Sequence, residues 1–353
     1  MNPRLHTSLC DLAGIDVPIV QTGMGWVAGP RLVSATANAG ALGILASATM
    51  DFEQLRAAVA EVRSRTTRPF GVNLRADAHD IDERVALLID QGIAVASFAQ
   101  APKESLIGRL HDGGVKVVPS IGAKRHAEKV LQWGVDAVLV QGGEGGGHTG
   151  SVPTSILLPQ VVDAVRGRIP VIAAGGFFDG RGLVAALAYG ADGIAMGTRF
   201  LLTSDSAVPQ AVKDVYLGKS VTETTVTKQV DGVPHRVLNT ELIDQLESGR
   251  GKLLALPRAA LNALRFRKLT GIGLRQMARE GLAMRASGEL SWTQTLMAAN
   301  TPMLLKAALV DGKVDSGVMA SGQVVGVIDD LPSCKELIDR IIAEAEATLA
   351  RLA

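Results

Sequence analysis

The sequence predicts an α/β fold, a (β/α)8 TIM barrel with a smaller, mainly helical domain inserted late in the chain. Short runs of β-branched apolar residues alternate with longer segments of helical periodicity, and the alternation occurs eight times within about 200 residues. A repeated strand and helix requires right-handed crossovers and a parallel sheet. Glycine-rich loops follow the last three runs, where barrels carry their active sites. A doubly wound open sheet is the alternative, but it gives no reason for the repeat to stop at eight.

The eight predicted strands are short and aliphatic. Apolar residues make up 47% of the chain and aromatic residues only 3%, a mixture typical of parallel strands buried under helices. Helical spacing separates the strands, for example in Asp51–Arg65 and Asp80–Gln91. The predicted strands are Val17–Gln21, Leu42–Leu45, Phe70–Leu74, Ala94–Phe98, Val115–Ser120, Ala137–Gln141, Pro170–Ala173 and Gly193–Met196.

The repeat breaks after the eighth unit, which predicts three regions. Residues 1–216 form the barrel, residues 217–311 form an inserted helical domain, and residues 312–353 return to the barrel with a last strand and helix. The inserted domain is expected because the pattern is largely helical there. Gly317–Ile328 is glycine-rich and β-branched, and Asp330–Leu352 has the spacing of a long amphipathic helix.

Composition excludes several classes of protein. The net charge of +1 gives no reason to expect a nucleic-acid partner. Cys10 and Cys334 lie far apart and have no metal or redox spacing, so we expect no metal site, no disulfide and a reducing cytoplasm. No apolar run approaches the roughly 18 residues that cross a bilayer, and no leader is evident. The expectation is a cytoplasmic protein without a membrane partner.

The loop Gln141–Gly150 directly follows the sixth predicted strand and holds six glycines in ten residues. Ordering so many glycines costs much backbone entropy, so such a loop is retained where the backbone lies against a flat or phosphorylated ligand. A flexible linker is the alternative reading. It is disfavoured because a strand and a helix flank the loop at ordinary barrel spacing.

Two further motifs follow the seventh and eighth predicted strands. They are Ala173–Gly176 and Met196–Arg199, about 20 residues apart. Barrels commonly build a phosphate site at these positions from backbone N–H groups and the start of a helix. Either motif alone is uninformative, but the pair predicts a bound mononucleotide or a phosphorylated substrate.

Together these motifs resemble the nitronate monooxygenase family, formerly called 2-nitropropane dioxygenase, which includes flavin-dependent enoyl reductases. The resemblance also covers Pro18–Gly25 and Ser321–Ile338, and so spans essentially the whole chain. It implies a barrel that carries FMN, a helical domain (residues 217–311) that covers the flavin and the substrate, and often a homodimer. The substrate would have an acidic C–H or a conjugated double bond. NAD(P)H as electron donor or NAD(P)+ as acceptor is a further option.

The resemblance also implies a set of site residues. His148 matches the family's active-site histidine, and an imidazole that titrates near neutrality can exchange a proton with carbon while flavin N5 handles the hydride. A loop histidine that merely caps a neighbour is the alternative. The other five histidines have no comparable setting and are expected at the surface or in packing. The implied flavin residues are Met24, Gly25, Asn73, Gln141, Gly146, Gly147, Gly175, Gly176, Met196, Gly197 and Thr198.

The inserted segment is strongly basic. Nine basic residues and one acid lie between Arg250 and Arg285, against 27 basic and 34 acidic residues in the rest of the chain. Such a patch suits an anionic handle on the substrate, such as the phosphates of coenzyme A or of NAD(P)H. Solvated helix faces, pairing with the body or a dimer contact could use the same charges. The candidate substrate-binding residues are Arg265, Arg267, Lys268 and Arg275.

Three further segments, Ser34–Met50, Leu238–Gly249 and Met297–Lys313, resemble an actinobacterial branch of the family tied to steroid catabolism. This implies FMN-dependent hydrogen transfer α,β to a carbonyl of a bulky CoA thioester. The alternatives are nitronate monooxygenation with O2 and an NAD(P)H-dependent enoyl or quinone reductase. A binding module that has lost catalysis is disfavoured by His148 and the two phosphate loops. Gly145 and the proline-free Gln21–Gly25 depart from the usual family pattern, which leaves the substrate side open.

Overall fold

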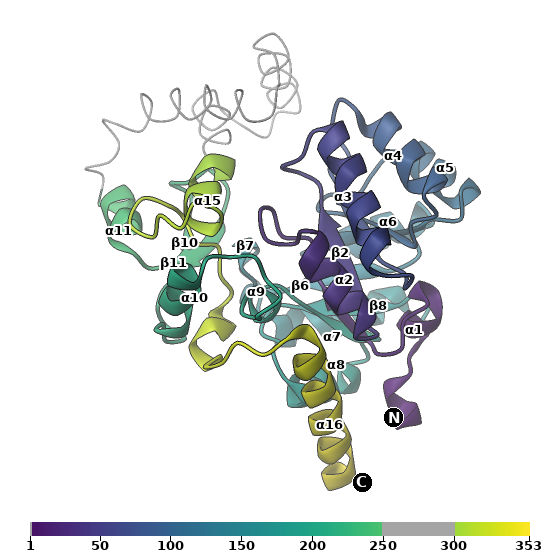
Figure 1. Cartoon of the computed structure of the whole chain (residues 1–353). Helices are drawn as coiled ribbons and strands as arrows, with labels where there is room; N and C mark the ends of the chain where they lie inside the picture. The colour runs from purple at the N-terminus through teal and green to yellow at the C-terminus, as the bar shows by residue number, and fades with distance from the viewer. Residues whose placement is uncertain (1, 249–300) are drawn as a thin grey trace. The chain divides into compact units, whose positions relative to one another are not determined.

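The computed structural model describes residues 2–248 and 301–353. These residues group into two compact units (Figure 1). The first unit comprises Met1–Gly145, Thr149–Ala207 and Ile328–Ala353, and the second comprises Gly146–His148 and Val208–Val327. These boundaries fall near residues 207 and 327, where the sequence suggested 216 and 311.

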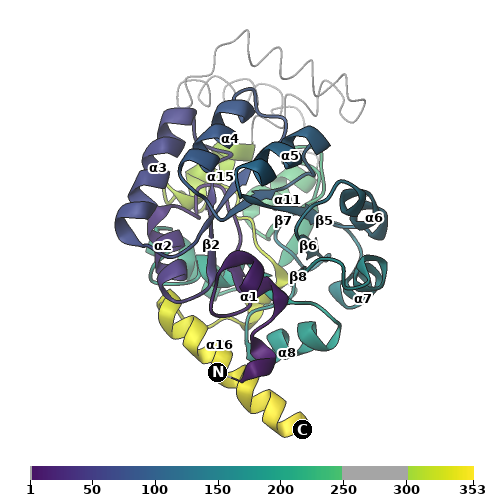
Figure 2. The same cartoon turned by 90° about the vertical axis from the view of Figure 1, so that its right-hand side faces the viewer.

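The first unit contains a closed barrel of eight parallel strands in chain order, which confirms the predicted fold class (Figure 2). Each of the eight predicted strands overlaps an observed one. The strands are β1 (Ile19–Gln21), β2 (Leu42–Ala46), β3 (Gly71–Leu74), β4 (Val95–Phe98), β5 (Lys116–Ile121), β6 (Val138–Gln141), β8 (Val171–Ala174) and β9 (Gly193–Met196).

Helices surround the barrel because each strand is followed by a segment with one apolar face. α3 shows the pattern clearly: Asp51 caps its first turn, and Leu55, Val59 and Val62 are buried. The helices of this unit are η1 (Pro3–Leu5), α1 (Ser8–Ala13), α2 (Pro30–Asn38), α3 (Phe52–Arg65), α4 (Ile81–Asp90), α5 (Glu104–Asp112), α6 (Lys124–Gln132), α7 (Thr154–Val165), α8 (Gly180–Ala188), α9 (Thr198–Leu201) and α16 (Cys334–Leu352).

The terminal helix α16 returns to the barrel, packing against α8 and α2 (Figure 2). It begins at Cys334, four residues later than predicted, because Ser333 and Glu336 form a capping box after Pro332. Its buried face includes Leu337 and Ile341. Cys10 and Cys334 are both free and buried, and burial raises the pKa of the Cys334 thiol to about 12.

The second unit contains a small antiparallel sheet with the strand order β10-β11-β7. A largely helical region was predicted here, and the sheet was missed because its strands are short and partly polar. The core of the unit includes Val230, Val237, Ile243 and Val318. Its elements are β7 (Gly147–His148), α10 (Gln210–Leu217), β10 (Thr224–Thr227), β11 (His235–Leu238), α11 (Glu241–Glu247), α15 (Thr301–Leu309) and η2 (Gln323–Val327).

The strand predicted within Gly317–Ile328 does not form. The segment instead makes one isolated bridge, between Ala320 and Val237, and the 3-10 helix η2. Its glycines serve close packing, since a Cβ on Gly326 would collide with the backbone at Val221. Among the described residues, no helix is both long and apolar enough to cross a membrane.

Candidate active site

Most of the predicted flavin residues of the first unit lie at the carboxyl ends of the barrel strands. Strand register places Gln21 beside Met196 and Gln141 beside Ala174. Asn73 pairs with Ala46 at the same end of β3. Because all eight strands are parallel, these residues form one rim of the barrel, the rim at which such folds build active sites.

The loop after β8 has a backbone that favours glycine. Gly175 and Gly176 have φ of 91° and 88°, in the region that L side chains rarely adopt. A Cβ on Gly175 would lie only 3.1 Å from the carbonyl oxygen of Gly142. A glycine backbone allows a ligand to approach its N–H groups closely, so this loop can accept a phosphate.

Glu144 and Thr154 connect the glycine loop after β6 with the loop after β8. The Thr154 backbone N–H donates to the Glu144 carboxylate, at 3.0 Å from Oε2. The Thr154 hydroxyl lies 2.7 Å from Glu144 Oε2 and 2.9 Å from the carbonyl oxygen of Gly175. With one hydrogen it donates to one of these acceptors at a time. Sequence reasoning missed this connection, which holds both loops at the rim.

The loop after β1 packs against two other strand ends. A Cβ on Gly23 would lie 2.6 Å from Cβ of Asn73, and one on Gly197 would lie 3.3 Å from Sδ of Met24. Met24 therefore lies beside Gly197, and Gly23 lies beside Asn73 at the end of β3. Trp26, two residues after Met24, has a φ of 65°, an uncommon value for a bulky residue.

Gln21 ends β1 and is fully buried. Its Nε2 donates to the carbonyl oxygen of Ile44 at 3.3 Å. Within the described part of the chain, its Oε1 has no hydrogen-bond partner. A buried acceptor without a donor costs free energy unless a bound group or water supplies one. This orphaned oxygen at the rim is consistent with a ligand that offers an N–H or O–H.

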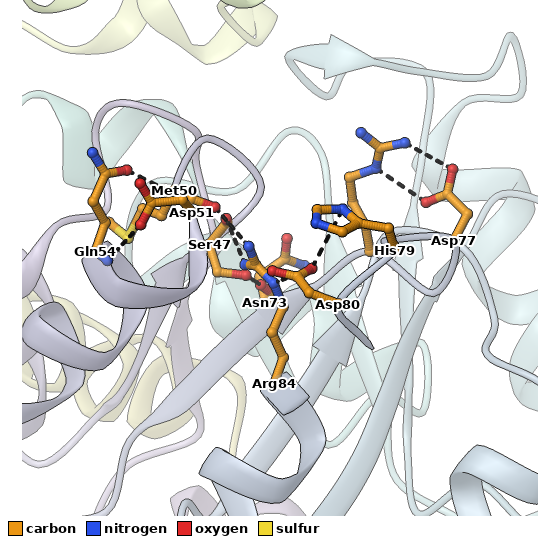
Figure 3. Close-up of polar contacts among 10 residues, drawn as sticks. Ser47, Met50, Asp51, Gln54, Asn73, Asp77, His79, Asp80 and Arg84 are labelled. Atoms are coloured by element: carbon orange, nitrogen blue, oxygen red, sulfur yellow. Dashed lines mark hydrogen bonds and ion pairs between the residues drawn. The ribbon is translucent and has the colours of Figure 1, made fainter. Parts of the chain in front are cut away.

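A polar cluster fixes the ends of β2 and β3 (Figure 3). The buried Arg84 guanidinium donates to the carbonyl oxygens of Ser47 and Met50 at 3.1 and 2.7 Å, and to Asp80 at 2.8 Å. Burial raises the pKa of Asp80, but the hydrogen bond and charge of Arg84 lower it by more. The Ser47 hydroxyl donates to the carbonyl oxygen of Asn73 at 2.6 Å. The cluster thereby holds the backbone of Asn73 at the rim.

His148 belongs to the second unit, where β7 pairs with β11 and sets His148 opposite His235. Its Nε2 lies 2.7 Å from Oδ2 of Asp231. The two imidazole rings are 4.7 Å apart between centroids and tilted by 56°. The His148 side chain is 59% exposed while that of Asp231 is 5% exposed. The arrangement is an accessible imidazole anchored on a buried carboxylate.

Asp231 is held ionised by its surroundings. Burial raises its pKa, but the hydrogen bond from His148 and the nearby His235 lower it by more, so the net pKa is well below its usual range. Its Oδ1 accepts from the backbone N–H of Val233 at 3.1 Å, and the Thr301 hydroxyl lies 3.2 Å from Oδ2. Sequence reasoning missed Asp231 because 83 residues separate it from His148.

Gly146 and Gly147 also fall in the second unit. A Cβ on Gly146 would lie 2.5 Å from the backbone N of Gly322, which gives this glycine a packing role of its own. His235, predicted at the surface or in packing, is buried against His148. The basic residues Arg265, Arg267, Lys268 and Arg275 lie outside the described residues.

Comparisons with known proteins extend over nearly the whole chain. The family model described as nitronate monooxygenase matches residues 6–85 and 78–344. The chain is 63% identical over 343 residues to a Mycobacterium tuberculosis protein named (3aS,4S,5R,7aS)-5-hydroxy-7a-methyl-1-oxo-octahydro-1H-indene-4-carboxyl-CoA dehydrogenase, covering 97% of this chain and 96% of that one. A Rhodococcus jostii protein of the same name is 60% identical over 341 residues, with the same coverage. The solved structure of FabK from Thermotoga maritima has a TM-score of 0.80 and 32% identity over 98% of each chain.

Proposed function

Because the chain belongs to the nitronate monooxygenase family, we propose that it is an FMN-dependent dehydrogenase that acts on a bulky CoA thioester. The family match confirms the resemblance seen in the sequence, and with it that the protein is an oxidoreductase. The single observation that carries the proposal is the arrangement of two neighbouring strand ends at the barrel rim. Gly175 and Gly176, which have positive φ, follow β8, and α9 begins just after the adjacent strand β9.

The residues of the first unit fit FMN. Gly175, Gly176, Gly197 and Thr198 would hold the phosphate, because they offer backbone at neighbouring strand ends. Met24 and Gly25 would lie along the ring system. The ring edge would bond Asn73 and Gln141, and the orphaned Oε1 of Gln21 supports a donor nearby. Met196 of the first unit, and Gly146 and Gly147 of the second, would complete the set that the resemblance implies. Bound FMN supplies a two-electron acceptor at N5.

His148 would take the proton. A C–H next to a thioester carbonyl is acidic, and a positioned imidazole can remove that proton as a general base. The β-carbon would lose a hydride in the same oxidation, so that a carbon–carbon double bond forms and two electrons leave the substrate. His148 would return its proton to solvent, which its 59% exposed side chain supports.

The substrate class follows from the relatives. Both the mycobacterial and the rhodococcal protein are named as dehydrogenases of a bicyclic carboxyl-CoA, and identity of 60% or more over nearly the full length supports a similar substrate here. The basic segment around Arg265, Arg267, Lys268 and Arg275 would bind the CoA phosphates. A small nitronate has no such phosphates.

Anaerobic spectroscopy tests this proposal. The purified protein should absorb in the flavin bands near neutral pH, and released cofactor should have the mass of FMN. Mixing with the indane-carboxyl-CoA substrate class should bleach the flavin under anaerobic conditions, and an alkyl nitronate should not. The reoxidant is then found by adding NAD(P)+ or O2.

Three outcomes would overturn the proposal in different ways. Purified protein without flavin absorbance would show that FMN is not its cofactor. Rapid bleaching by a nitronate with oxygen uptake, and no response to the thioester, would make the protein a nitronate monooxygenase. Bleaching by NAD(P)H followed by reoxidation with an enoyl thioester or a quinone would reverse the direction and make it a reductase.

A further inference from the structure

We propose that Asp231 is a positioning residue that selects the tautomer of His148, so that Nδ1 is the ring atom that exchanges the substrate proton. The inference rests on the proposed role of His148 as the base. It adds which of the two ring nitrogens acts and which residue decides this.

The hydrogen bond between the two residues has only one chemically allowed direction. An ionised carboxylate accepts and cannot donate, and the pKa of Asp231 is held below its usual range. His148 Nε2, 2.7 Å from Oδ2, must therefore carry the hydrogen. In the neutral imidazole the lone pair is then on Nδ1, the only ring atom that can accept a proton.

Asp231 is itself fixed more firmly than a surface carboxylate. It is buried and receives the backbone N–H of Val233 on Oδ1. The Thr301 hydroxyl lies within hydrogen-bond distance of Oδ2 as well. A carboxylate held from several sides cannot follow the imidazole if it rotates, so it defines one ring orientation.

His235 packs against the imidazole ring of His148. It is 2% exposed, and its ring lies 4.7 Å from that of His148. Its Nδ1 is 3.6 Å from Oδ2 of Asp231, and neither ring nitrogen has a hydrogen-bond partner among the described residues. His235 therefore contributes packing against His148, and Asp231 contributes a hydrogen bond of ordinary length.

One other reading of the same cluster must be tested. The ligand atoms of His148, Asp231 and His235 lie within 4.8 Å of one another, a donor set that transition metals accept. A metal would bind the lone pair of Nε2, which then could not carry a hydrogen. The two readings thus predict opposite protonation of the same atom.

The kinetic test compares Asp231→Asn, Asp231→Glu and Thr301→Val with the wild-type holoenzyme. Asp231→Asn should lower kcat by about 10²-fold or more, with KM and the flavin spectrum unchanged, because the amide no longer selects one tautomer. The carboxylate of Asp231→Glu should restore part of the loss. Thr301→Val, which keeps the Asp231 carboxylate, should lower kcat by less than about 10-fold.

A double-mutant cycle separates positioning from a structural role. His148→Ala should lose turnover, and adding Asp231→Asn to it should cause no further loss, since Asp231 acts only through the imidazole. An equal further loss would make Asp231 structural and overturn the inference. Full turnover by His148→Ala would instead overturn the proposed function, and undiminished turnover by Asp231→Asn with an impaired His148→Ala would overturn the positioning role alone.

Nitrogen NMR of the ¹⁵N-histidine-labelled wild-type protein provides a test that does not depend on the kinetics of a variant. The signals of His148, assigned by their loss in His148→Ala, should show the hydrogen on Nε2 of the neutral ring. A hydrogen on Nδ1 would overturn the inference. So would stoichiometric zinc or another transition metal in the purified protein that is lost in His148→Ala.

Discussion

The backbone conformation of Gly175 and Gly176 is the residue-scale feature on which the predicted phosphate site depends. Both have positive φ, and a Cβ on Gly176 would meet nothing of this unit closer than 3.9 Å. The protein itself therefore leaves room for a side chain at Gly176. The remaining reason for glycine, besides its φ, is the approach of a ligand to the backbone.

Gly176→Ala tests that reason. We expect the unfolding free energy to fall by roughly 1 kcal/mol from backbone strain, and FMN retention to fall at least tenfold. The ratio of flavin to protein absorbance after gel filtration measures retention.

Gly134→Ala is the matched control for this variant, because Gly134 has a φ of 78° with nothing within 4 Å of its Cβ position. It should lose a similar amount of stability and keep its flavin. Equal flavin retention in Gly176→Ala and Gly134→Ala would show that Gly176 does not take part in binding the phosphate.

His148 and Asp231 show what is and is not predictable at this scale. His148 was identified because its glycine-rich loop resembles that of the family, where it matches the active-site histidine. Asp231 stands in an ordinary Asp-Gly turn, and its four-residue spacing from His235 is the one local signal it carries. Nothing local connects it with a histidine 83 residues earlier, because a turn is consistent with many tertiary partners.

Among the elements, α9 and the segment that leads into α16 are joined by an ion pair whose arginine is buried. Arg199 is 3% exposed, and its Nη1 donates to Asp330 at 2.9 Å. Its Nη2 donates to the carbonyl oxygens of Leu202 and Asp330 at 2.6 and 2.9 Å. Arg340 of α16 reaches the same carboxylate from the exposed side, at 2.6 Å. The last helix is thus connected to α9, the short helix that follows β9.

Arg199→Met should lower the unfolding free energy by about 3 kcal/mol, because the carbonyl oxygens of Leu202 and Asp330 lose their donor and the Asp330 carboxylate loses its buried one. Arg340→Met removes an exposed partner of the same carboxylate and should cost about 0–1 kcal/mol. Urea unfolding followed by circular dichroism measures both. Comparable losses in the two variants would show that burial of the pair does not matter.

The strands and helices of the barrel could be predicted because their signals are local. Aliphatic runs of four to six residues and helical spacing recur with little interruption, and all eight observed barrel strands overlap predicted ones. The sheet of the second unit could not be predicted in the same way. β10 reads Thr-Thr-Val-Thr and β7 has only two residues, so pairing with β11 decides both.

For the whole molecule, several carboxylates make stability depend on pH. The net pKa values of Asp77, Asp80, Asp231 and Asp330 are lowered. For the first three, burial is the largest single effect and raises the pKa, but hydrogen bonds and charges outweigh it. For Asp330 the hydrogen bond from Arg340 is largest. A carboxylate with a lowered native pKa stabilises the fold above its unfolded pKa of about 3.9.

The thermal midpoint should therefore fall as the pH is lowered from about 5 to about 3. Protonation of these carboxylates removes the stabilisation that they contribute at neutral pH. Asp80→Asn should lower the midpoint at pH 7, by roughly 2–4 °C for each kcal/mol lost. The difference from wild type should shrink at pH 3. Differential scanning fluorimetry across this range measures both effects, with the exposed Asp82→Asn of the same helix as control. A difference that stays constant with pH would contradict the linkage.

The sequence by itself determined the barrel, the order of its strands, the family and the loops at its rim. These follow from local periodicity, from glycine placement and from motifs that need no knowledge of distant residues. Only the tertiary structure decided that Glu144 and Thr154 connect two of those loops, and that His148 is anchored on a buried Asp231. The physical reason is that burial and long-range pairing set the orientation and charge of a side chain, and neither is encoded by neighbours in the chain.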